Sequence, residues 1–496
     1  MNRDIMLQQL QQTEKWEIVI IGGGATGLGA ALDATTRGYK TLLVEAYDFA
    51  KGTSGRSTKL VHGGVRYLAQ GNIKLVMEAL RERGYLLKNA PHISSASPFI
   101  VPAYSWYDKY FYGIGLKVYD ILAGKLSLGK TKWLSKKETL EQLPGISDKN
   151  LKGGILYYDG QFDDARLAID LAATAIDHGA TVLNYCEATA LIKTDGKISG
   201  IEIEDTISKK TYQVKAQIVI NATGVFTDDI MQMDEPENEM LVSPSQGTHL
   251  VVDRKFFPGT SALMIPKTTD GRVLFAVPWH NKVVLGTTDT PVHDISFEPT
   301  PLEEEINFIL HNANLYLSQP VERTDVLSTF AGLRPLVKVK GAKNTALLSR
   351  DHTILVSKAN LVTITGGKWT TYRRMAEDVV NNAAFAAKLP RKECVTKQLA
   401  IGNNAKGKGN DFLQQAFHYT EQDIAHFVQN EMAMTVEDIL SRRTRLLLVD
   451  AEAAIEAAPA VAKMMAGHMN KDEQWINEQV ETFVQLANNY KLETPN

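Results

Sequence analysis

Apolar and polar positions form a clear block pattern over the first 45 residues. Residues 16–21 are an uninterrupted apolar run rich in β-branched side chains, which predicts a buried strand. Three glycines end this run. Residues 25–37 are rich in alanine and leucine and predict a helix, and residues 41–45 predict a second buried strand. A strand, a helix and a strand within about 30 residues are the unit of a parallel sheet.

The pattern changes along the rest of the chain. Residues 241–330 alternate short β-rich runs with Pro- and Gly-containing turns, which is typical of a mostly antiparallel sheet. Apolar runs at 217–220 and 361–365 predict two further strands, and each leads into a glycine-containing turn. After Pro390 the sequence becomes polar and then helical to its end. This shift predicts a C-terminal helical domain.

Composition and charge narrow the range of partners. The chain has 496 residues, and its net charge of −3 is too close to neutral to indicate a nucleic-acid partner. Its two cysteines, Cys186 and Cys394, form no CxxC pair, which argues against a cysteine-based zinc site and suits a reducing compartment. No segment resembles the apolar core of a signal peptide or a transmembrane helix. We therefore expect a cytoplasmic protein without a bound metal.

The glycines after the first strand form a nucleotide-binding motif. Residues 22–27 read GGGATG and fit the pattern G-x-G-x-x-G between a strand and a helix. Gly22 permits the tight turn, Gly24 lets backbone N–H groups approach a diphosphate, and Gly27 lets helix and strand pack closely. Glu45 ends the second strand, where its carboxylate can accept hydrogen bonds from ribose hydroxyls. The motif predicts a dinucleotide site, and the alternative is a glycine turn without a ligand.

Three later segments favour FAD over NAD. Residues 53–59 read TSGRSTK, a polar loop suited to wrapping a phosphate, and glycine turns follow the strands at 221–224 and 365–368. Three such turns at one sheet suit an extended dinucleotide whose flavin reaches a second domain, whereas an NAD dehydrogenase would continue with further β-α-β units. The residues that we predict to bind FAD are Gly22, Gly24, Gly27, Glu45, Thr53, Ser54, Ser57, Thr58, Lys59, Ala222, Gly224, Gly367 and Lys368.

These elements predict an α/β fold in three parts. The first is an FAD-binding Rossmann-type domain of the glutathione-reductase-like kind, assembled from residues 1–90, 150–240 and 331–388. The second is an antiparallel-sheet substrate-binding or cap region from residues 91–149 and 241–330. The third is the C-terminal helical domain, residues 389–496.

Five stretches resemble the signature of the aerobic, FAD-dependent glycerol-3-phosphate dehydrogenases. They are STKLVHGGVRYL at 57–68, AGLRP at 331–335, SRDH at 349–352, GGKWTTY at 366–372 and LSRRT at 440–444. The resemblance covers nearly the whole chain. It departs from the family at Arg56, where a small residue is usual, and at Trp369, where leucine is common. We find no calcium-binding loop of the mitochondrial type and no long insertion of the oxidase type, so the electron acceptor stays open.

The resemblance implies a reaction and a substrate pocket. The reaction is oxidation of sn-glycerol 3-phosphate to dihydroxyacetone phosphate by hydride transfer from C2 to flavin N5. It requires cations for a phosphate dianion, a base for the hydroxyl proton and positive charge near the developing alkoxide. We assign Arg350 and Lys368 to the phosphate and Arg334 to flavin N5 and the C2 oxygen. The expected substrate-binding residues are Arg66, Tyr67, His249, Arg334, Arg350 and Lys368.

Two histidines compete for the role of base. His249 leads into an apolar strand of the substrate region, and His62 lies in the flavin-side loop. If residues 62–66 are helical, His62 shares a face with Arg66. A structural role is the alternative for each histidine. The predicted catalytic residues are therefore Arg334, His249 and His62.

Residues 106–133 interleave cationic and aromatic side chains. This pattern suits peripheral contact with a membrane surface, which would bring the enzyme to the inner face of the cell membrane and to a quinone pool. The alternative is a packed subdomain with solvated lysines. The lysines are Lys109, Lys117, Lys125, Lys130 and Lys132, and the aromatic residues are Trp106, Tyr107, Tyr110, Phe111, Tyr112, Tyr119 and Trp133.

The leading interpretation is a glycerol-3-phosphate dehydrogenase that passes electrons to a membrane quinone. An oxidase that passes them to oxygen and forms hydrogen peroxide is the nearest alternative, and oxidation of an amino acid is a further one. A different class is a binding or assembly module in which FAD is structural. A homodimer is one candidate for the oligomeric state.

Overall fold

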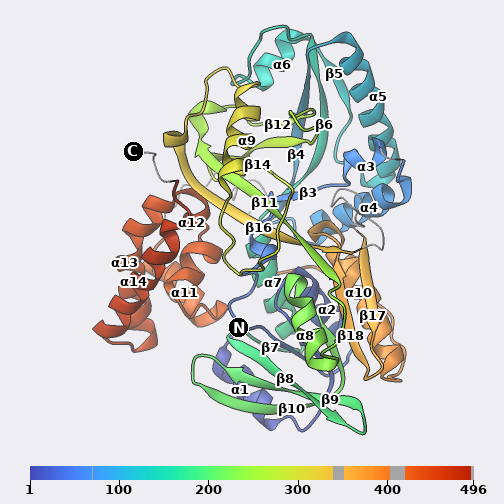
Figure 1. The fold of residues 1–496 in the computed structure, drawn as a ribbon, viewed down its shortest axis with the longest axis vertical. Coiled ribbons are helices and arrows are strands. Elements are labelled where there is room, and N and C mark those ends of the chain that lie inside the picture. Colours follow the sequence, from blue (N-terminus) through green and yellow to red (C-terminus); the bar gives the residue numbers. More distant parts are fainter. Residues whose placement is uncertain (70, 339–350, 403–418, 493–496) are drawn as a thin grey trace.

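The computed structural model describes residues 1–69, 71–338, 351–402 and 419–492. These residues form two β-sheets with surrounding helices and a group of C-terminal helices. Figure 1 shows the smaller sheet in the lower part of the molecule, the larger sheet in the upper part, and the C-terminal helices at one flank. The α/β fold with an antiparallel substrate region and a helical C-terminal region is therefore confirmed.

The smaller sheet has eight strands in the order β17-β18-β10-β1-β2-β7, with β8 and β9 attached to β10. The strands from β18 to β7 pair in parallel. Its strands are β1 (Trp16–Ile21), β2 (Thr41–Val44), β7 (Thr181–Leu183), β8 (Cys186–Thr194), β9 (Lys197–Asp205), β10 (Lys210–Asn221), β17 (His352–Val356) and β18 (Leu361–Gly366).

Helices α2 (Ala25–Thr36), α7 (Asp164–Asp177) and α10 (Tyr372–Ala386) pack together beside the parallel strands. The side chains of β1 are almost all buried, as expected where a parallel sheet is covered on both faces. For this reason its sequence reads as a continuous apolar run.

The larger sheet has ten strands and is mostly antiparallel, with one parallel pair between β4 and β12. Its strands are β3 (Leu60–Val61), β4 (Ser94–Ala103), β5 (Lys132–Leu134), β6 (Gly153–Phe162), β11 (Val242–Asp253), β12 (Ala262–Ile265), β13 (Leu274–Trp279), β14 (Lys282–Gly286), β15 (Thr290–Pro291) and β16 (Val326–Val337). β3, β6 and part of β16 join this sheet although they lie in the ranges predicted for the FAD-binding domain. The domain boundaries themselves stay predictions.

The larger sheet buries both of its faces. Ile100 and Ile265 face a core shared with α9 (Glu303–Asn314). Their neighbours Phe99 and Met264 face a second core, shared with α4 (Ile73–Asn89) and α5 (Trp106–Ala123). This alternation is the period of two expected in strands.

The C-terminal helices are α11 (Glu421–Glu431), α12 (Leu446–Val449), α13 (Ala451–Met469) and α14 (Glu473–Asn488). They share a core with Trp279 and Phe330 of the larger sheet. The remaining helices are α1 (Arg3–Gln12), α3 (Val65–Ala69), α6 (Lys136–Gln142) and α8 (Thr227–Asp234). Among the described residues, none of the helices combines the length and the apolar character needed to cross a membrane.

Candidate active site

A cavity of about 150 Å³ lies at the carboxyl ends of β1, β2, β10 and β18. Gly22 forms its turn with φ of +112°, and a Cβ atom at this position would lie 2.6 Å from the carbonyl oxygen of Ala222. A Cβ at Gly27 would lie 1.8 Å from the carbonyl oxygen of Gly22. The glycine motif is therefore required by close backbone packing, as the sequence predicts.

Two side chains close this cavity around the start of α2. The hydroxyl of Ser54 accepts a hydrogen bond of 2.9 Å from the backbone N–H of Ala25. The Glu45 carboxylate accepts hydrogen bonds from the backbone N–H groups of Gly23 (2.6 Å) and Tyr47 (2.9 Å). Burial raises the pKa of Glu45, and these hydrogen bonds oppose that shift. Glu45 is thus fixed at the edge where a ribose would lie.

Most residues predicted to bind FAD line this cavity or a larger one beside it. The exceptions are Gly27, which packs helix against strand, and Lys59. The Lys59 ammonium is fully buried and binds the carboxylate of Asp164 at 2.8 Å. Its charge is used in this internal ion pair, so the sequence reasoning that placed the charge at a phosphate is not supported, and any contact of Lys59 with FAD stays a prediction. The lining residues are Gly22, Gly24, Glu45, Thr53, Ser54, Ser57, Thr58, Ala222, Gly224, Gly367 and Lys368.

The C-terminal region supports the loop that follows Glu45. Asp48 is fully buried and binds the guanidinium groups of Arg442 (2.6 Å) and Arg443 (3.1 Å). Burial opposes the charge on Asp48, but Arg443 and Arg442 together hold its pKa below its usual value. These arginines belong to the LSRRT stretch, so this stretch holds the loop after Glu45, the cofactor loop, through Asp48.

The larger cavity has a volume of about 310 Å³ and contains five of the predicted substrate or catalytic residues. It shares a wall with the smaller cavity at Thr53, Pro335 and residues 366–369. The side chain of Arg66 and all of Arg350 lie outside the described residues. The five residues in the cavity are His62, Tyr67, His249, Arg334 and Lys368.

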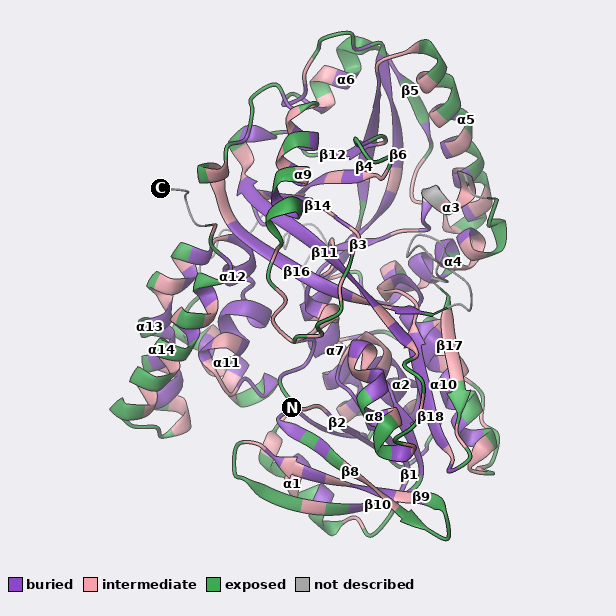
Figure 2. Cartoon of the chain, in the orientation of Figure 1, coloured by how far each residue is buried: buried purple, intermediate pink, exposed green. Residues whose placement is uncertain are grey.

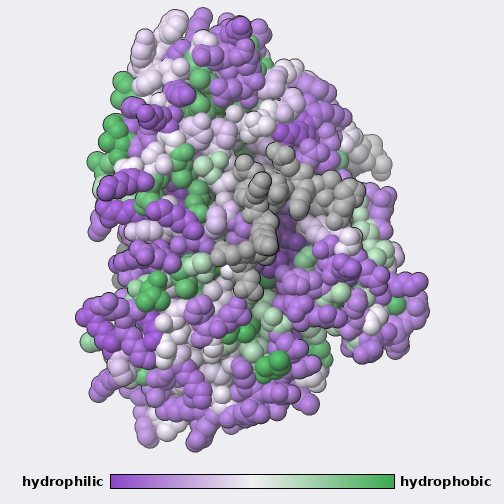
Figure 3. Space-filling model, turned by 180° about the vertical axis from the view of Figure 1, so that it is seen from behind, coloured by the Kyte–Doolittle hydropathy of each residue, from purple (hydrophilic) through white to green (hydrophobic). Residues whose placement is uncertain are grey.

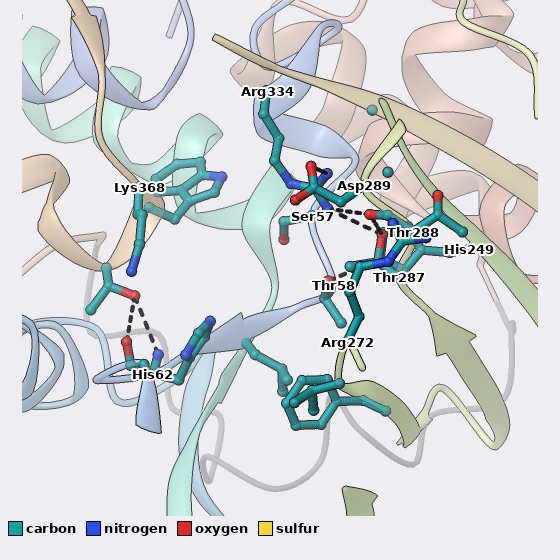
Figure 4. Close-up of a pocket in the computed structure, with 18 of the residues that line it drawn as sticks. Ser57, Thr58, His62, His249, Arg272, Thr287, Thr288, Asp289, Arg334 and Lys368 are labelled. Carbon is teal, nitrogen blue, oxygen red and sulfur yellow. Dashed lines mark hydrogen bonds and ion pairs between the residues drawn. The ribbon is translucent and has the colours of Figure 1, made fainter. Parts of the chain in front are cut away.

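Arg334 is held in place by the turn after β14. Its guanidinium donates to the carbonyl oxygen of Thr288 at 2.9 Å and to the Asp289 carboxylate at 3.2 Å. Figure 4 shows Arg334, Asp289, Thr288 and His249 on one side of the cavity. A fixed guanidinium of this kind can stabilise negative charge that develops on a substrate oxygen.

His249 is buried, and its Nε2 lies 2.9 Å from the hydroxyl oxygen of Thr58. Its ring stacks on Phe330 with the centroids 4.6 Å apart. Burial lowers its pKa well below the usual value, and the positive charges of Lys59 and Arg334 lower it further. The imidazole is therefore neutral near pH 7, which is the form that can accept a proton.

His62 and Lys368 lie on the other side of the cavity in Figure 4. The backbone N–H of His62 donates to the hydroxyl of Thr370, and this hydroxyl donates to the carbonyl oxygen of His62. His62 lies before α3 and is not part of a helix. The condition under which His62 and Arg66 would share a helical face is therefore not met. The Lys368 ammonium lies 4.1 Å from the ring centroid of Tyr67.

The cavity contains polar residues that sequence reasoning missed. They are Arg272, Thr287, Thr288, Asp289 and Asp159. The polar run Thr287-Thr288-Asp289 directly after the glycine that ends β14 is a signal that could have indicated a functional turn. Asp159 gives no such signal, because it lies within β6. It reaches the cavity only because β6 pairs with other strands of the sheet.

Comparison with known proteins assigns the family. A family model described as FAD dependent oxidoreductase matches residues 17–373, and one described as the C-terminal domain of alpha-glycerophosphate oxidase matches residues 360–476. The mitochondrial glycerol-3-phosphate dehydrogenase of Homo sapiens is 40% identical over 541 aligned residues, which cover 97% of this chain and 74% of that protein. The chain belongs to the FAD-dependent glycerol-3-phosphate dehydrogenase family. The glycerol-3-phosphate dehydrogenase SDP6 of Arabidopsis thaliana is 36% identical over 96% of this chain and 86% of that protein.

Solved structures agree with this assignment. The glycerol-3-phosphate dehydrogenase of Bacillus halodurans, complexed with FAD, has a TM-score of 0.80 and 28% identity over 100% of this chain and 99% of that chain. The L-alpha-glycerophosphate oxidase of Mycoplasma pneumoniae, also with FAD, shares the fold at a TM-score of 0.59 and 17% identity over 82% of this chain and 100% of that one. The cofactor prediction is confirmed: this family member uses FAD. The glycine turn, Glu45 and the N-terminus of α2 fit its ADP half.

Proposed function

We propose that this protein oxidises sn-glycerol 3-phosphate to dihydroxyacetone phosphate, with bound FAD as the hydride acceptor. One observation carries the proposal: Arg334, neutral His249 and Lys368 line a single cavity that shares a wall with the dinucleotide cavity. The names of the relatives, which are glycerol-3-phosphate dehydrogenases over nearly the full chain, support the same substrate.

The cationic side chains would bind the phosphate and orient the substrate. Lys368 supplies a point charge at the wall shared by the two cavities, and Arg350 and Arg66 are proposed to add to it. We assign Arg334 to the C2 oxygen. Its contacts with Asp289 and with the Thr288 carbonyl fix the direction of its guanidinium. In this arrangement the phosphate end of the substrate is anchored, and its C2 oxygen lies at Arg334.

The proton from the C2 hydroxyl requires a neutral base. We assign it to Nε2 of His249, because burial and the neighbouring cations keep this imidazole unprotonated. Nε2 lies 2.9 Å from the hydroxyl of Thr58, which lines the same cavity. His62 is left with a packing role beside Thr370.

An anaerobic titration tests the reaction. Addition of sn-glycerol 3-phosphate to the FAD-loaded protein should bleach the flavin absorbance with a stoichiometry of one, while glycerol without phosphate should not. Persistent flavin absorbance with glycerol 3-phosphate would contradict the proposal and favour a structural role for FAD. Oxygen or a quinone analogue is then added to the reduced protein, and the rates at which the two restore the flavin absorbance are compared.

We propose a membrane quinone as the acceptor, and the exposed side of α5 supports it. Trp106, Tyr110 and Ile114 follow one another at intervals of four residues and are each about 60% exposed. Figure 3 shows hydrophobic side chains gathered on the upper left edge, where α5 lies when the molecule is seen from behind. Exposed Lys117, together with further lysines at 125, 130 and 132, can attract anionic headgroups beside this apolar stripe.

Sedimentation with vesicles tests this contact. The protein should bind vesicles that contain anionic phospholipid, less so in high salt, and the variant Tyr110→Ser should bind more weakly. Phe385→Ser is the matched control, since Phe385 is also exposed but lies on α10. Equal binding by both variants, or none by the parent protein, would contradict the membrane contact and favour oxygen as the acceptor. Cytoplasmic location at the inner face of the membrane and a homodimer stay predictions.

A further inference from the structure

Glu305 is a buried carboxylate in the first turn of α9. This helix packs on β11, β13 and β14, and Figure 2 shows exposed residues along its outer side. The preceding residues Glu303 and Glu304 are exposed, whereas Glu305 is only 2% exposed. Its side chain lies outside both cavities described above. Any role of Glu305 in the reaction must therefore pass through the residues that it contacts.

Neutral hydrogen-bond donors surround the Glu305 carboxylate. Its Oε1 accepts a hydrogen bond of 2.6 Å from the hydroxyl of Thr288. Its Oε2 accepts from the hydroxyl of Thr248 at 2.7 Å and from the side-chain amide of Gln246 at 2.8 Å. The backbone N–H of Leu302 also donates to Oε2, at 3.1 Å. These donors offset the cost of burying a charged group.

Glu305 stays ionised in these surroundings. Burial alone would raise its pKa, but the hydrogen bonds from Thr288, Thr248 and Gln246 outweigh burial and hold the pKa below its usual value. The positive end of the α9 helix dipole favours the same negative charge. An ionised carboxylate only accepts hydrogen bonds, so it fixes the direction in which all three side chains donate.

Two of these three residues also bind Arg334, through their backbone. The Arg334 guanidinium donates to the carbonyl oxygen of Thr288 at 2.9 Å and to that of Gln246 at 3.3 Å. It lies so close to β11 that a Cβ atom at Gly247 would have no room. Figure 4 shows Arg334 and Thr288 on the same side of the cavity. Gln246 and Thr288 are thus held at both ends, by Glu305 through the side chain and by Arg334 through the carbonyl.

A further hydrogen bond joins the two segments that meet at Glu305. The backbone N–H of Thr248, on β11, donates to the hydroxyl of Thr288 at 2.9 Å, and this hydroxyl donates in turn to Glu305. Thr248 directly precedes His249 in the sequence. One carboxylate on α9 therefore ties the turn after β14 to the strand that carries His249.

We propose that Glu305 is a positioning residue for flavin reduction, which holds the carbonyls of Thr288 and Gln246 where they direct the Arg334 guanidinium. The inference rests on the proposed function, in which Arg334 meets the C2 oxygen of glycerol 3-phosphate. Stabilisation of developing charge depends on donors that are aligned before the reaction begins. Loss of the Glu305 carboxylate should therefore slow the chemical step more than it weakens substrate binding.

The variant Glu305→Gln keeps the size of the side chain but replaces one accepting oxygen by a donor. In the FAD-loaded protein, the limiting rate of flavin reduction should fall about tenfold, which is less than the ~10²-fold cost of misplacing a reacting group by 1 Å. The dissociation constant of glycerol 3-phosphate should change less than about threefold. A parent-like rate of flavin reduction in folded Glu305→Gln would overturn the proposal.

Asp228→Asn is the matched control for the loss of a buried carboxylate. Asp228 lies in the first turn of α8, is buried, and accepts hydrogen bonds from the backbone N–H groups of Leu241 and Val242. This variant should keep the parent rate of flavin reduction. An equal fall of the rate in Asp228→Asn and Glu305→Gln would assign the effect to lost stability and contradict the positioning role.

Combination with Arg334→Ala separates positioning from stability. If Glu305 acts through Arg334, adding Glu305→Gln to Arg334→Ala should slow flavin reduction by less than about a further twofold, because the effects of coupled residues are not additive. Guanidinium ions that restore part of the Arg334→Ala rate would bind at the carbonyls that Arg334 has left. The double variant should therefore need about fivefold more guanidinium, in line with the loss of one hydrogen bond. A further tenfold loss of rate, or rescue at the same concentration, would count against the proposal.

Thr288 provides a second test that leaves Glu305 in place. Thr288→Val removes the hydroxyl that links the turn to the carboxylate and keeps the shape of the side chain, so it should slow flavin reduction as Glu305→Gln does. Thr288→Ser keeps the hydroxyl and should be at least about fivefold faster than Thr288→Val. This pair carries the test if Glu305→Gln does not fold, and equal rates in the two variants would refute the proposal. Failure of glycerol 3-phosphate to bleach the flavin of the parent protein is seen before any variant is compared, and it contradicts the proposed function instead.

Discussion

Arg334 and Asp289 form an ion pair of 3.2 Å inside the larger cavity, although Arg334 lies on β16 and Asp289 lies in the turn after β14. Asp289 also accepts a short hydrogen bond from Ser245, so its carboxylate is anchored from a second side. The consequence is that the direction of the arginine is fixed before a substrate binds. A preorganised charge of this kind loses little energy to reorganisation in the transition state.

Replacement of Asp289 should therefore reduce catalysis without abolishing it. Asp289→Asn keeps the shape of the side chain but removes its charge, and we expect kcat/KM to fall roughly tenfold, in line with loss of one charge-assisted hydrogen bond. Stopped-flow measurement of flavin reduction over a range of substrate concentrations gives the corresponding second-order rate constant. Asp253→Asn, which removes the carboxylate partner of Lys282 elsewhere on β11, should leave it unchanged.

Removal of the guanidinium itself should have a larger effect. Arg334→Ala should lower the rate of flavin reduction by about 10²- to 10³-fold, the usual cost of a group that stabilises developing charge. Added guanidinium ions should restore part of the rate. Arg323→Ala removes an exposed ion pair with Glu303 and should behave like the parent protein. A normal rate in Arg334→Ala would remove this residue from the site.

His249 makes the stability of the protein depend on pH in a defined direction. The unfolded chain takes up a proton on this histidine as pH falls through about 6.5, whereas the folded protein, with a lower pKa, does not. The free energy of unfolding should therefore decrease as pH falls below about 6.5, by at most about 1.4 kcal/mol per pH unit from this group. Chemical denaturation at pH 7.5 and 5.5 should show a smaller decrease in His249→Gln than in the parent protein. An identical decrease in both would contradict the depressed pKa.

The close contact between Gly27 and Gly22 leads to a prediction for cofactor binding. Gly27→Ala places a methyl group against the Gly22 carbonyl, so the turn must move and FAD should be lost on gel filtration. Gly467→Ala in α13 meets nothing within 4 Å and should instead stabilise the protein by about 0.5–1 kcal/mol. Retention of FAD by both variants would show that the turn tolerates a side chain.

Asp48 should be one of the more sensitive positions outside the cavities. Asp48→Asn removes the carboxylate that the buried guanidinium groups of Arg442 and Arg443 share, which should lower the free energy of unfolding by about 3–5 kcal/mol. The same change should weaken FAD binding, since it loosens the loop after Glu45. Glu204→Gln, which removes an exposed ion pair with Lys209, should cost less than about 1 kcal/mol. Fluorescence-detected unfolding of the three proteins compares these values.

The parts of the molecule that sequence predicts well are those fixed by local signals. The β1-α2-β2 unit follows from an apolar run, three glycines and a helical period, and the structure reproduces it almost to the residue. Features that depend on distant pairing were missed. Asp289 and Phe275 line the cavity only because segments that are far apart in the sequence align. Lys59 lies outside it because its ammonium binds Asp164, more than one hundred residues later. Periodicity likewise could not decide which side of α5 faces solvent.

The ion pairs between Asp48 and the LSRRT stretch have a consequence for biosynthesis. A ribosome makes the cofactor loop early and the arginines that hold it only when about nine-tenths of the chain has been made, because synthesis runs from the N-terminus. Until then Asp48 has no partner in this stretch and the loop lacks its support. We therefore expect stable FAD loading only late in synthesis, and products truncated before this stretch should be found without flavin.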